Sequence, residues 1–169
     1  MSKKDNVVLI GMPGSGKSTL GVVLAKKLGF DFMDGDIEIQ NQYGKTLEEL
    51  IDIHGDAGFI QIENDVLAGL DVKNTVIATG GSAVYGEGAM AHLAEIGTIV
   101  YLDVPEEELN GRLGNLKARG VVCNGKTTVK EIFEERLSLY RKYAEITVTL
   151  DHVELKDAVE EIYSIVYNN

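Results

Sequence analysis

The sequence has one cysteine, Cys123, two prolines and no tryptophan among its 169 residues. A lone thiol cannot close an internal disulfide, so we expect a protein of a reducing compartment that is held together by its apolar core. No apolar run approaches the roughly 20 residues that span a bilayer, and the N-terminal stretch MSKKDNVVLIG has too short an apolar run for a signal peptide. We therefore expect a cytoplasmic protein with no membrane-inserted segment.

Cations are also scarce, because 16 Lys and Arg stand against 27 Asp and Glu and give a formal net charge of −11. Binding to a nucleic-acid backbone requires clustered cations, so this balance argues against general nucleic-acid affinity. The cations are unevenly spread, since residues 109–130 contain five of them and no acid. Such a run is either a solvated face or the contact region of a polyanionic ligand.

With 44% hydrophobic residues, the chain is long enough to bury one full core, and we expect a single domain over residues 1–169. Continuous Val/Ile/Leu runs alternate with stretches in which apolar residues recur at helical spacing. Runs of this kind are typical of strands buried on both faces, so we predict an α/β fold with a five-stranded parallel sheet and helices on both sides.

The expected strands are Asn6–Ile10, Phe30–Met33, Thr75–Ala78, Thr98–Leu102 and Ile146–Leu150. The expected helices are Ser18–Leu28, Ile37–Tyr43, Leu47–His54, Phe59–Leu70, Gly88–Ala94, Pro105–Leu113, Val129–Tyr143 and Leu155–Val166. The least periodic segment, at about 115–126, carries glycines and cations, and we expect it to form a mobile lid over a site.

A glycine-rich turn, GMPGSGKSTL at residues 11–20, joins the first expected strand to the first expected helix. It matches G-x-x-x-x-G-K-[ST], the pattern whose backbone N–H groups surround phosphate oxygens while the lysine neutralises their charge. Glycine lets the backbone curl around an anion, and the N-terminus of the following helix points its free N–H groups at the same place. The turn therefore predicts a binding site for a nucleotide polyphosphate. The expected contacts are Gly14, Ser15, Gly16, Lys17, Ser18 and Thr19.

Carboxylates and glycines follow the next two expected strands, where the carboxyl ends of a parallel sheet meet. Asp34 and Asp36 come after the second strand, and Gly80 and Gly81 leave backbone exposed after the third. An isolated Asp-Gly-Asp is commonly a turn in which an aspartate caps the next helix. Beside a phosphate loop, the pair also suits phosphoryl transfer: one carboxylate helps the hydroxyl of Ser18 to hold Mg²⁺, and the other positions an attacking hydroxyl.

Together, these features resemble the shikimate kinase family of small P-loop kinases. Five features occur in the family's order and cover nearly the whole chain. They are the phosphate loop, the Asp-x-Asp, the Gly-Gly, an arginine at the start of the cationic segment, and EERLSLYRKYA in the following helix. The resemblance implies a three-layer P-loop NTPase fold with a lid. It also implies ATP and Mg²⁺ as cofactors and a small hydroxylated substrate, with a monomeric protein that binds neither nucleic acid nor membrane.

The resemblance further implies roles for residues on the nucleotide side. Lys17 would contact the transferred phosphate, Ser18 would ligate Mg²⁺, and Asp34 would order the water shell of the metal. Arg112 would pack on adenine, and Arg119 would close from the lid onto the phosphates.

On the acceptor side, Asp36 would meet the substrate hydroxyl beside Gly80 and Gly81, and Arg136 would pair with a substrate carboxylate. The family usually has a second arginine for that carboxylate, directly after the Phe of an F-R-x-x-E segment. Here the segment is FIQIE, and Ile60 takes the place of the arginine. Losing one of two such contacts would weaken binding of an anionic substrate by roughly ten- to a hundredfold. Three further departures, at a family glycine and two family prolines, are Ser82, Gly120 and Ser138.

We expect an ATP-dependent kinase that transfers the γ-phosphoryl group to shikimate and gives shikimate 3-phosphate. The apolar Ile60 also suits a kinase of the same fold that acts on a less anionic hydroxylated metabolite. A third hypothesis is a nucleotide-binding regulator without turnover, although a carboxylate placed for an acceptor hydroxyl speaks against it.

Other reactive residues are expected to be structural. His54, His92 and His152 lie in three different segments without metal-ligand spacing, and Cys123 is a lone thiol in the expected lid. Glu63 could line the substrate crevice, but a glutamate on a helix surface is the commoner case.

Overall fold

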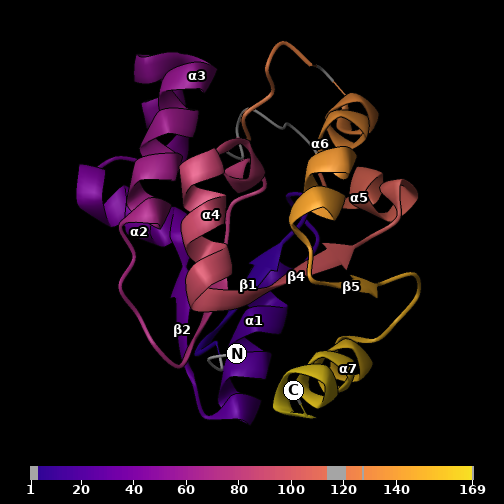
Figure 1. The fold of residues 1–169 in the computed structure, drawn as a ribbon. Helices are drawn as coiled ribbons and strands as arrows, with labels where there is room; N and C mark the ends of the chain where they lie inside the picture. Colours follow the sequence, from indigo (N-terminus) through magenta and orange to yellow (C-terminus); the bar gives the residue numbers. More distant parts are fainter. Residues whose placement is uncertain (1–3, 114–120, 127, 169) are drawn as a thin grey trace.

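The computed structural model of the chain describes residues 4–113, 121–126 and 128–168 (Figure 1). A five-stranded parallel sheet with the order β2-β3-β1-β4-β5 lies at its centre, which confirms the predicted sheet. The strands are β1 (Asn6–Ile10), β2 (Asp31–Asp34), β3 (Thr75–Ala78), β4 (Gly97–Asp103) and β5 (Ile146–Thr149). Each strand end lies within one residue of its predicted place.

The helices of the described residues also follow the prediction, with one difference. They are α1 (Lys17–Leu28), α2 (Gly35–Tyr43), α3 (Leu47–Ala68), α4 (Glu87–Ile96), α5 (Glu106–Arg112), α6 (Val129–Tyr143) and α7 (Leu155–Asn168), with a 3₁₀ turn, η1 (Ala83–Tyr85). The two helices expected around residue 55 join into α3, which is kinked at Gly55, where φ is +71°. Among the described residues, no helix combines the length and the apolar character needed to cross a membrane.

The continuous apolar runs arise because both faces of the sheet are covered. Along β1, Val7 and Leu9 belong to an apolar cluster with α1 and α7, whereas Val8 and Ile10 belong to a cluster with α3, α4 and α6. Figure 1 shows these two sets of helices on opposite sides of the sheet. The fold therefore has three layers, with one core on each side of the strands.

A third apolar cluster holds the segment 121–126 against the rest of the molecule. It joins α2 and α3 to Val122, and its buried members are Ile39, Leu50, Phe59, Ile62, Val66 and Val122. The described part of the predicted lid is thus packed against α3.

Parallel strands bring three turns to one edge of the sheet. The turn at 11–16 follows β1, Asp34 ends β2, and the turn at 79–82 follows β3. Thr79 holds the turn at 79–82 against β1, because its N–H (3.1 Å) and its Oγ1 (2.8 Å) both donate to the carbonyl of Leu9. This edge is where a ligand is expected in an open parallel sheet.

Candidate active site

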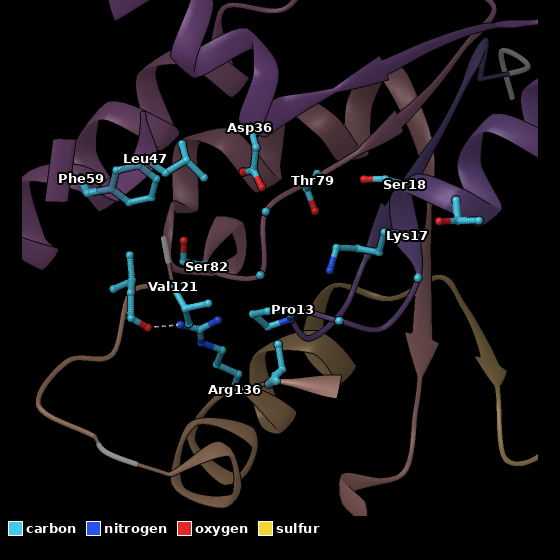
Figure 2. A pocket seen from close by; sticks show the side chains of 17 residues that line it. Pro13, Lys17, Ser18, Asp36, Leu47, Phe59, Thr79, Ser82, Val121 and Arg136 are labelled. Carbon is cyan, nitrogen blue, oxygen red and sulfur yellow. Dashed lines mark hydrogen bonds between the residues drawn. The ribbon is translucent and has the colours of Figure 1, made fainter. Parts of the chain in front are cut away.

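A cavity of about 450 Å³ opens at this edge, between the turn at 11–16 and the side chains of α2, α3 and α6 (Figure 2). Its wall is formed by Pro13, Gly14, Gly16, Lys17, Ser18, Thr19, Asp36, Leu47, Phe59, Thr79, Gly80, Gly81, Ser82, Leu113, Val121, Val122 and Arg136. Residues predicted for phosphate and residues predicted for the acceptor therefore face one space.

The turn at 11–16 has the curled backbone that phosphate binding needs. Gly14 (φ +77°) and Gly16 (φ +93°) both adopt the left-handed conformation that favours glycine. Lys17 is buried, and its Nζ donates to the carbonyls of Gly11 and Met12, each at 2.7 Å. Burial lowers the pKa of Lys17 to about 8, against the opposing effect of nearby carboxylates. The ammonium group of Lys17 is therefore bound to carbonyls of its own loop, and phosphate oxygens could replace these carbonyls as its partners.

Ser18 and Asp34 place a hydroxyl and a carboxylate side by side next to this loop. The Ser18 hydroxyl donates to Asp34 Oδ2 at 2.7 Å, while Asp34 Oδ1 accepts from the N–H of Asp36 at 2.9 Å as the N-cap of α2. The helix cap and the contact with Ser18 therefore coexist, since each uses a different oxygen of Asp34. A hydroxyl and a carboxylate are ligands that suit Mg²⁺, so the donor set fits the predicted metal.

Asp36 and the glycines after β3 form the floor of the cavity. Burial, reinforced by the charge of Asp34, raises the pKa of Asp36 to about 6, and Figure 2 shows its carboxylate directed into the same cavity as Lys17. A Cβ on Gly80 would lie 2.7 Å from Asp36 Oδ1, and a Cβ on Gly81 would lie 2.6 Å from Pro13 Cδ. Neither position has room for a side chain, so the floor presents bare backbone to a ligand.

Arg136 supplies a buried cation without enough partners. The side chain is 1% exposed, and its Nη2 donates to the carbonyl of Val122 at 2.5 Å. Its Nε and Nη1 find no hydrogen-bond acceptor among the described residues. Burying unpaired charged donors is costly, so this guanidinium fits a site that receives an anion from outside the chain.

The sequence matches one known protein family over most of its length. The family model described as shikimate kinase matches residues 13–166. The chain belongs to the shikimate kinase family. It is therefore an ATP-dependent kinase, as the sequence predicted.

Individual relatives agree with the family model over almost the whole chain. The shikimate kinase of Thiobacillus denitrificans is 38% identical over 151 residues, which cover 88% of this chain and 82% of the relative. The shikimate kinase of Clostridium botulinum strain Eklund 17B is 33% identical over 98% of this chain and 99% of the relative.

Solved structures of the family share the fold. Shikimate kinase from Acinetobacter baumannii in complex with shikimate is 28% identical and has a TM-score of 0.84 over 98% of this chain and 94% of that one. Shikimate kinase from Aquifex aeolicus is 34% identical and has a TM-score of 0.81 over 96% of each chain. The predicted three-layer P-loop kinase fold is thereby confirmed.

Within this shikimate kinase fold, two of the predicted nucleotide contacts that the structure describes, Ser15 and Arg112, lie outside the cavity wall. Ser15 is buried behind the loop, with its hydroxyl 3.3 Å from the Nζ of Lys17. Arg112 is exposed and braces the loop from outside, because its Nη1 donates to the carbonyl of Gly14 at 2.9 Å and its Nη2 to Glu108 at 3.1 Å. Arg119 lies outside the described residues, as do residues 115–120 of the predicted lid.

Ile60 also lies outside the wall of this shikimate kinase cavity. The side chain is half-buried and packs against the apolar cluster of α2 and α3, while its neighbour Phe59 faces the cavity. Among the described residues of the wall, Arg136 is thus the guanidinium available to an acceptor.

The expectation that Glu63 lies on a helix surface is wrong. Glu63 is 1% exposed, and it accepts a hydrogen bond from the hydroxyl of Ser82 at 2.6 Å. Its Oε2 would lie 2.6 Å from a Cβ on Gly80, so the carboxyl supports the cavity floor from behind. Burial raises its pKa to about 7. Its place on the same helical face as Phe59 and Val66, both buried, is the sequence signal that could have revealed this.

The three histidines lie outside the cavity wall. His92 Nε2 lies 2.6 Å from the carbonyl of Leu70 just beyond α3, and His54 is exposed. His152 is exposed too, with Nδ1 3.9 Å from Glu108 and Nε2 3.4 Å from Asp151.

Replacing Glu63 by glutamine should stabilise the protein at pH 8 and have little effect at pH 5. The raised pKa means that the folded state retains a proton that the unfolded state releases above about pH 4.5, so the wild type loses stability as the pH rises toward 7. The glutamine variant escapes this loss, which is at most roughly 3 kcal/mol for the shift from the ordinary value. Urea unfolding at both pH values measures the difference. Equal effects at pH 5 and pH 8 would contradict the prediction, and Glu134→Gln on the exposed side of α6 is the control.

Proposed function

We propose that this chain transfers the γ-phosphoryl group of ATP to a hydroxyl of shikimate. The observation that carries the proposal is the buried guanidinium of Arg136, in the same cavity as the phosphate loop, whose Nε and Nη1 find no hydrogen-bond acceptor among the described residues. Shikimate is a hydroxylated ring that bears a carboxylate, and the related enzyme from Acinetobacter baumannii has been solved in complex with it. Its carboxylate would complete the hydrogen bonding of Arg136 and place the ring over Gly80 and Gly81.

On the nucleotide side, the backbone N–H groups of the turn at 11–16 would surround the phosphates of ATP. Lys17 would leave the carbonyls of Gly11 and Met12 and bind the transferred group, which gains charge on its outer oxygens in the transition state. Ser18 and Asp34 would hold Mg²⁺, which supplies neutralising charge at the phosphates when it is bound.

On the acceptor side, Asp36 would orient the attacking hydroxyl and accept its proton as the new P–O bond forms. Its raised pKa makes it a better proton acceptor than an exposed aspartate, and it lies across the cavity from Lys17. The apolar side chains of Leu47, Phe59 and Val122 would cover the ring and exclude water, which would otherwise compete as the acceptor.

The test is an assay of ADP release with Mg²⁺-ATP and a panel of hydroxylated acids, sugars and amino alcohols, followed by phosphorus NMR of the product. Strong stimulation by shikimate and a phosphomonoester product are expected. Stimulation by a different acceptor alone would favour a kinase for another metabolite. Absence of stimulation by any acceptor, with intact ATP binding, would favour a regulator without turnover.

Replacing Ile60 by arginine should lower the Michaelis constant for shikimate by up to about tenfold, because a second guanidinium could reach the carboxylate. Half-burial of Ile60 against the cluster of α2 and α3 allows the longer side chain to extend along the helix toward the cavity. Steady-state kinetics with shikimate and thermal unfolding are the measurements. A stable variant that loses activity toward an uncharged acceptor and gains none toward shikimate would defeat the assignment of shikimate.

A further inference from the structure

Tyr85, which is not part of the cavity wall, lies against the guanidinium of Arg136. The Cζ of Arg136 is 5.4 Å from the centre of the Tyr85 ring, within the range of a cation–π contact. Tyr85 ends the 3₁₀ turn η1, which directly follows the glycines of the cavity floor. The ring therefore connects the floor to the cation that the proposed acceptor would meet.

The hydroxyl of Tyr85 fixes the ring in place. It donates a hydrogen bond to Glu135, the residue that precedes Arg136 on α6. Burial of the tyrosine, together with this bond, raises the pKa of Tyr85. Two neighbouring residues of α6 thus contact the tyrosine. Glu135 binds the hydroxyl of Tyr85, and the guanidinium of Arg136 lies over the ring of Tyr85.

Glu135 also binds the segment at 121–126. It accepts from Asn124 Nδ2 at 3.4 Å and lies 4.0 Å from Lys126 Nζ, while the N–H of Asn124 donates to Asp56 at 2.9 Å. Because the carbonyl of Val122 accepts from Arg136 Nη2, the same segment fixes another part of the guanidinium.

These contacts restrict the direction in which Arg136 can point. The ring of Tyr85 covers it, Nη2 is bound to Val122, and Nη1 would lie 2.9 Å from a Cβ on Gly81, on the cavity floor. A guanidinium that is already oriented loses little conformational entropy when an anion binds. Preorganisation matters more here because, with Ile60 outside the wall, the described residues place no second guanidinium in the cavity.

We propose that Tyr85, held by Glu135, is a positioning residue that aims Arg136 at the carboxylate of the acceptor and gives the site its preference for carboxylates over uncharged groups. The inference rests on the proposed function, because it assumes that Arg136 meets the acceptor. It adds two residues outside the cavity wall to the determinants of acceptor choice.

The first test compares Tyr85→Leu, which removes the ring, with Tyr85→Phe, which keeps the ring and removes the hydroxyl. Tyr85→Leu should raise the Michaelis constant for shikimate about tenfold, with kcat and the Michaelis constant for ATP within about twofold of wild type. Tyr85→Phe should recover only part of the affinity, because it keeps the ring over Arg136 but loses the hydrogen bond that holds the ring to Glu135. The control is Tyr143→Leu, since Tyr143 makes a cation–π contact with Lys142 outside the cavity wall.

The carboxamide of shikimate separates positioning from a general loss of structure. Tyr85→Leu should lower the preference for carboxylate over carboxamide about tenfold, since the neutral group gains little from an oriented cation. Equal weakening of both acceptors, or no weakening of either, would overturn the inference.

A second readout does not depend on the identity of the acceptor. The Nε–H resonance of Arg136, assigned by its loss in Arg136→Lys, should be shifted by the ring current of Tyr85 in the free protein. It should move in Tyr85→Leu and stay in place in Tyr143→Leu. An unmoved resonance would overturn the inference even in a protein that phosphorylates shikimate. A moved resonance in a protein with no shikimate-dependent ADP release would support the positioning of Arg136 and remove only the proposed acceptor.

Discussion

Replacing Lys17 by alanine should lower kcat for phosphoryl transfer by about 100- to 1,000-fold, the range seen when one preorganised charged donor is lost at a transition state. Its Nζ lies 2.7 Å from the carbonyls of Gly11 and Met12, so the cation is held at the centre of the loop where phosphate would bind. Steady-state kinetics with saturating Mg²⁺-ATP and acceptor measure the effect.

The same variant should keep the fold. Burial lowers the pKa of Lys17 to about 8, which means that the folded protein already holds this charge at a cost. Removal relieves that cost but leaves two loop carbonyls without a donor, so the two effects oppose each other. Thermal unfolding should therefore change little. Lys26→Ala, at the exposed end of α1, is the control, and near-normal turnover by Lys17→Ala would contradict the kinase mechanism.

The phosphate loop could be predicted from the sequence because its chemistry is local. Gly14 and Gly16 must adopt positive φ, which few other residues tolerate, and the strand and helix that flank them are marked by apolar periodicity. Asp34 was predicted with two alternative roles, cap or ligand, and the structure shows that its two oxygens satisfy the cap and contact Ser18 at once.

The surroundings of the acceptor residues could not be predicted in the same way, because they depend on packing between distant elements. Glu63 is buried only because the turn after β3 lies against α3 and supplies the hydroxyl of Ser82. Tyr140 is likewise fixed by distant partners: it stacks on Tyr101 at 5.1 Å and donates to the carbonyl of Gly81 at 2.7 Å. Helical spacing with Phe59 and Val66 marks Glu63 as buried, but no local pattern identifies Ser82 or Gly81 as a hydrogen-bond partner. The sequence therefore indicated the cavity floor but not what supports it.

Arg136 shows the same division between motif and environment. The segment EERLSLYRKYA places an arginine on α6, but only the fold shows that it is 1% exposed and that, within the part of the chain the structure describes, two of its nitrogens have no hydrogen-bond acceptor. The missing partners are informative because a folded chain does not ordinarily leave buried charged donors unsatisfied. Such a group destabilises the free protein, binds a ligand, or does both. One substitution at Arg136 can measure the stability of the free protein and the binding of the ligand.

Replacing Arg136 by methionine should abolish most acceptor binding while leaving the free protein at least as stable as the wild type. Methionine fills much of the volume of the arginine stem without bringing an unpaired charge into the core, an exchange that is often neutral or stabilising. Loss of the charged contact to a carboxylate should raise the Michaelis constant for shikimate by about 100-fold, whereas ATP binding should change little. Thermal unfolding with and without shikimate tests both effects, because a ligand that binds only the folded state raises the melting temperature.

In the wild type, millimolar shikimate should raise the melting temperature, and in Arg136→Met this shift should disappear even though the ligand-free protein melts no earlier. The matched control is Arg141→Met, because Arg141 lies on the same helix but is exposed. This variant should keep the full shift in melting temperature. If Arg136→Met retained the shift, the acceptor carboxylate would have to bind elsewhere in the cavity. If the variant were strongly destabilised without ligand, the two bare nitrogens of Arg136 would have partners in solution, and the argument from its burial to an anionic acceptor would fail.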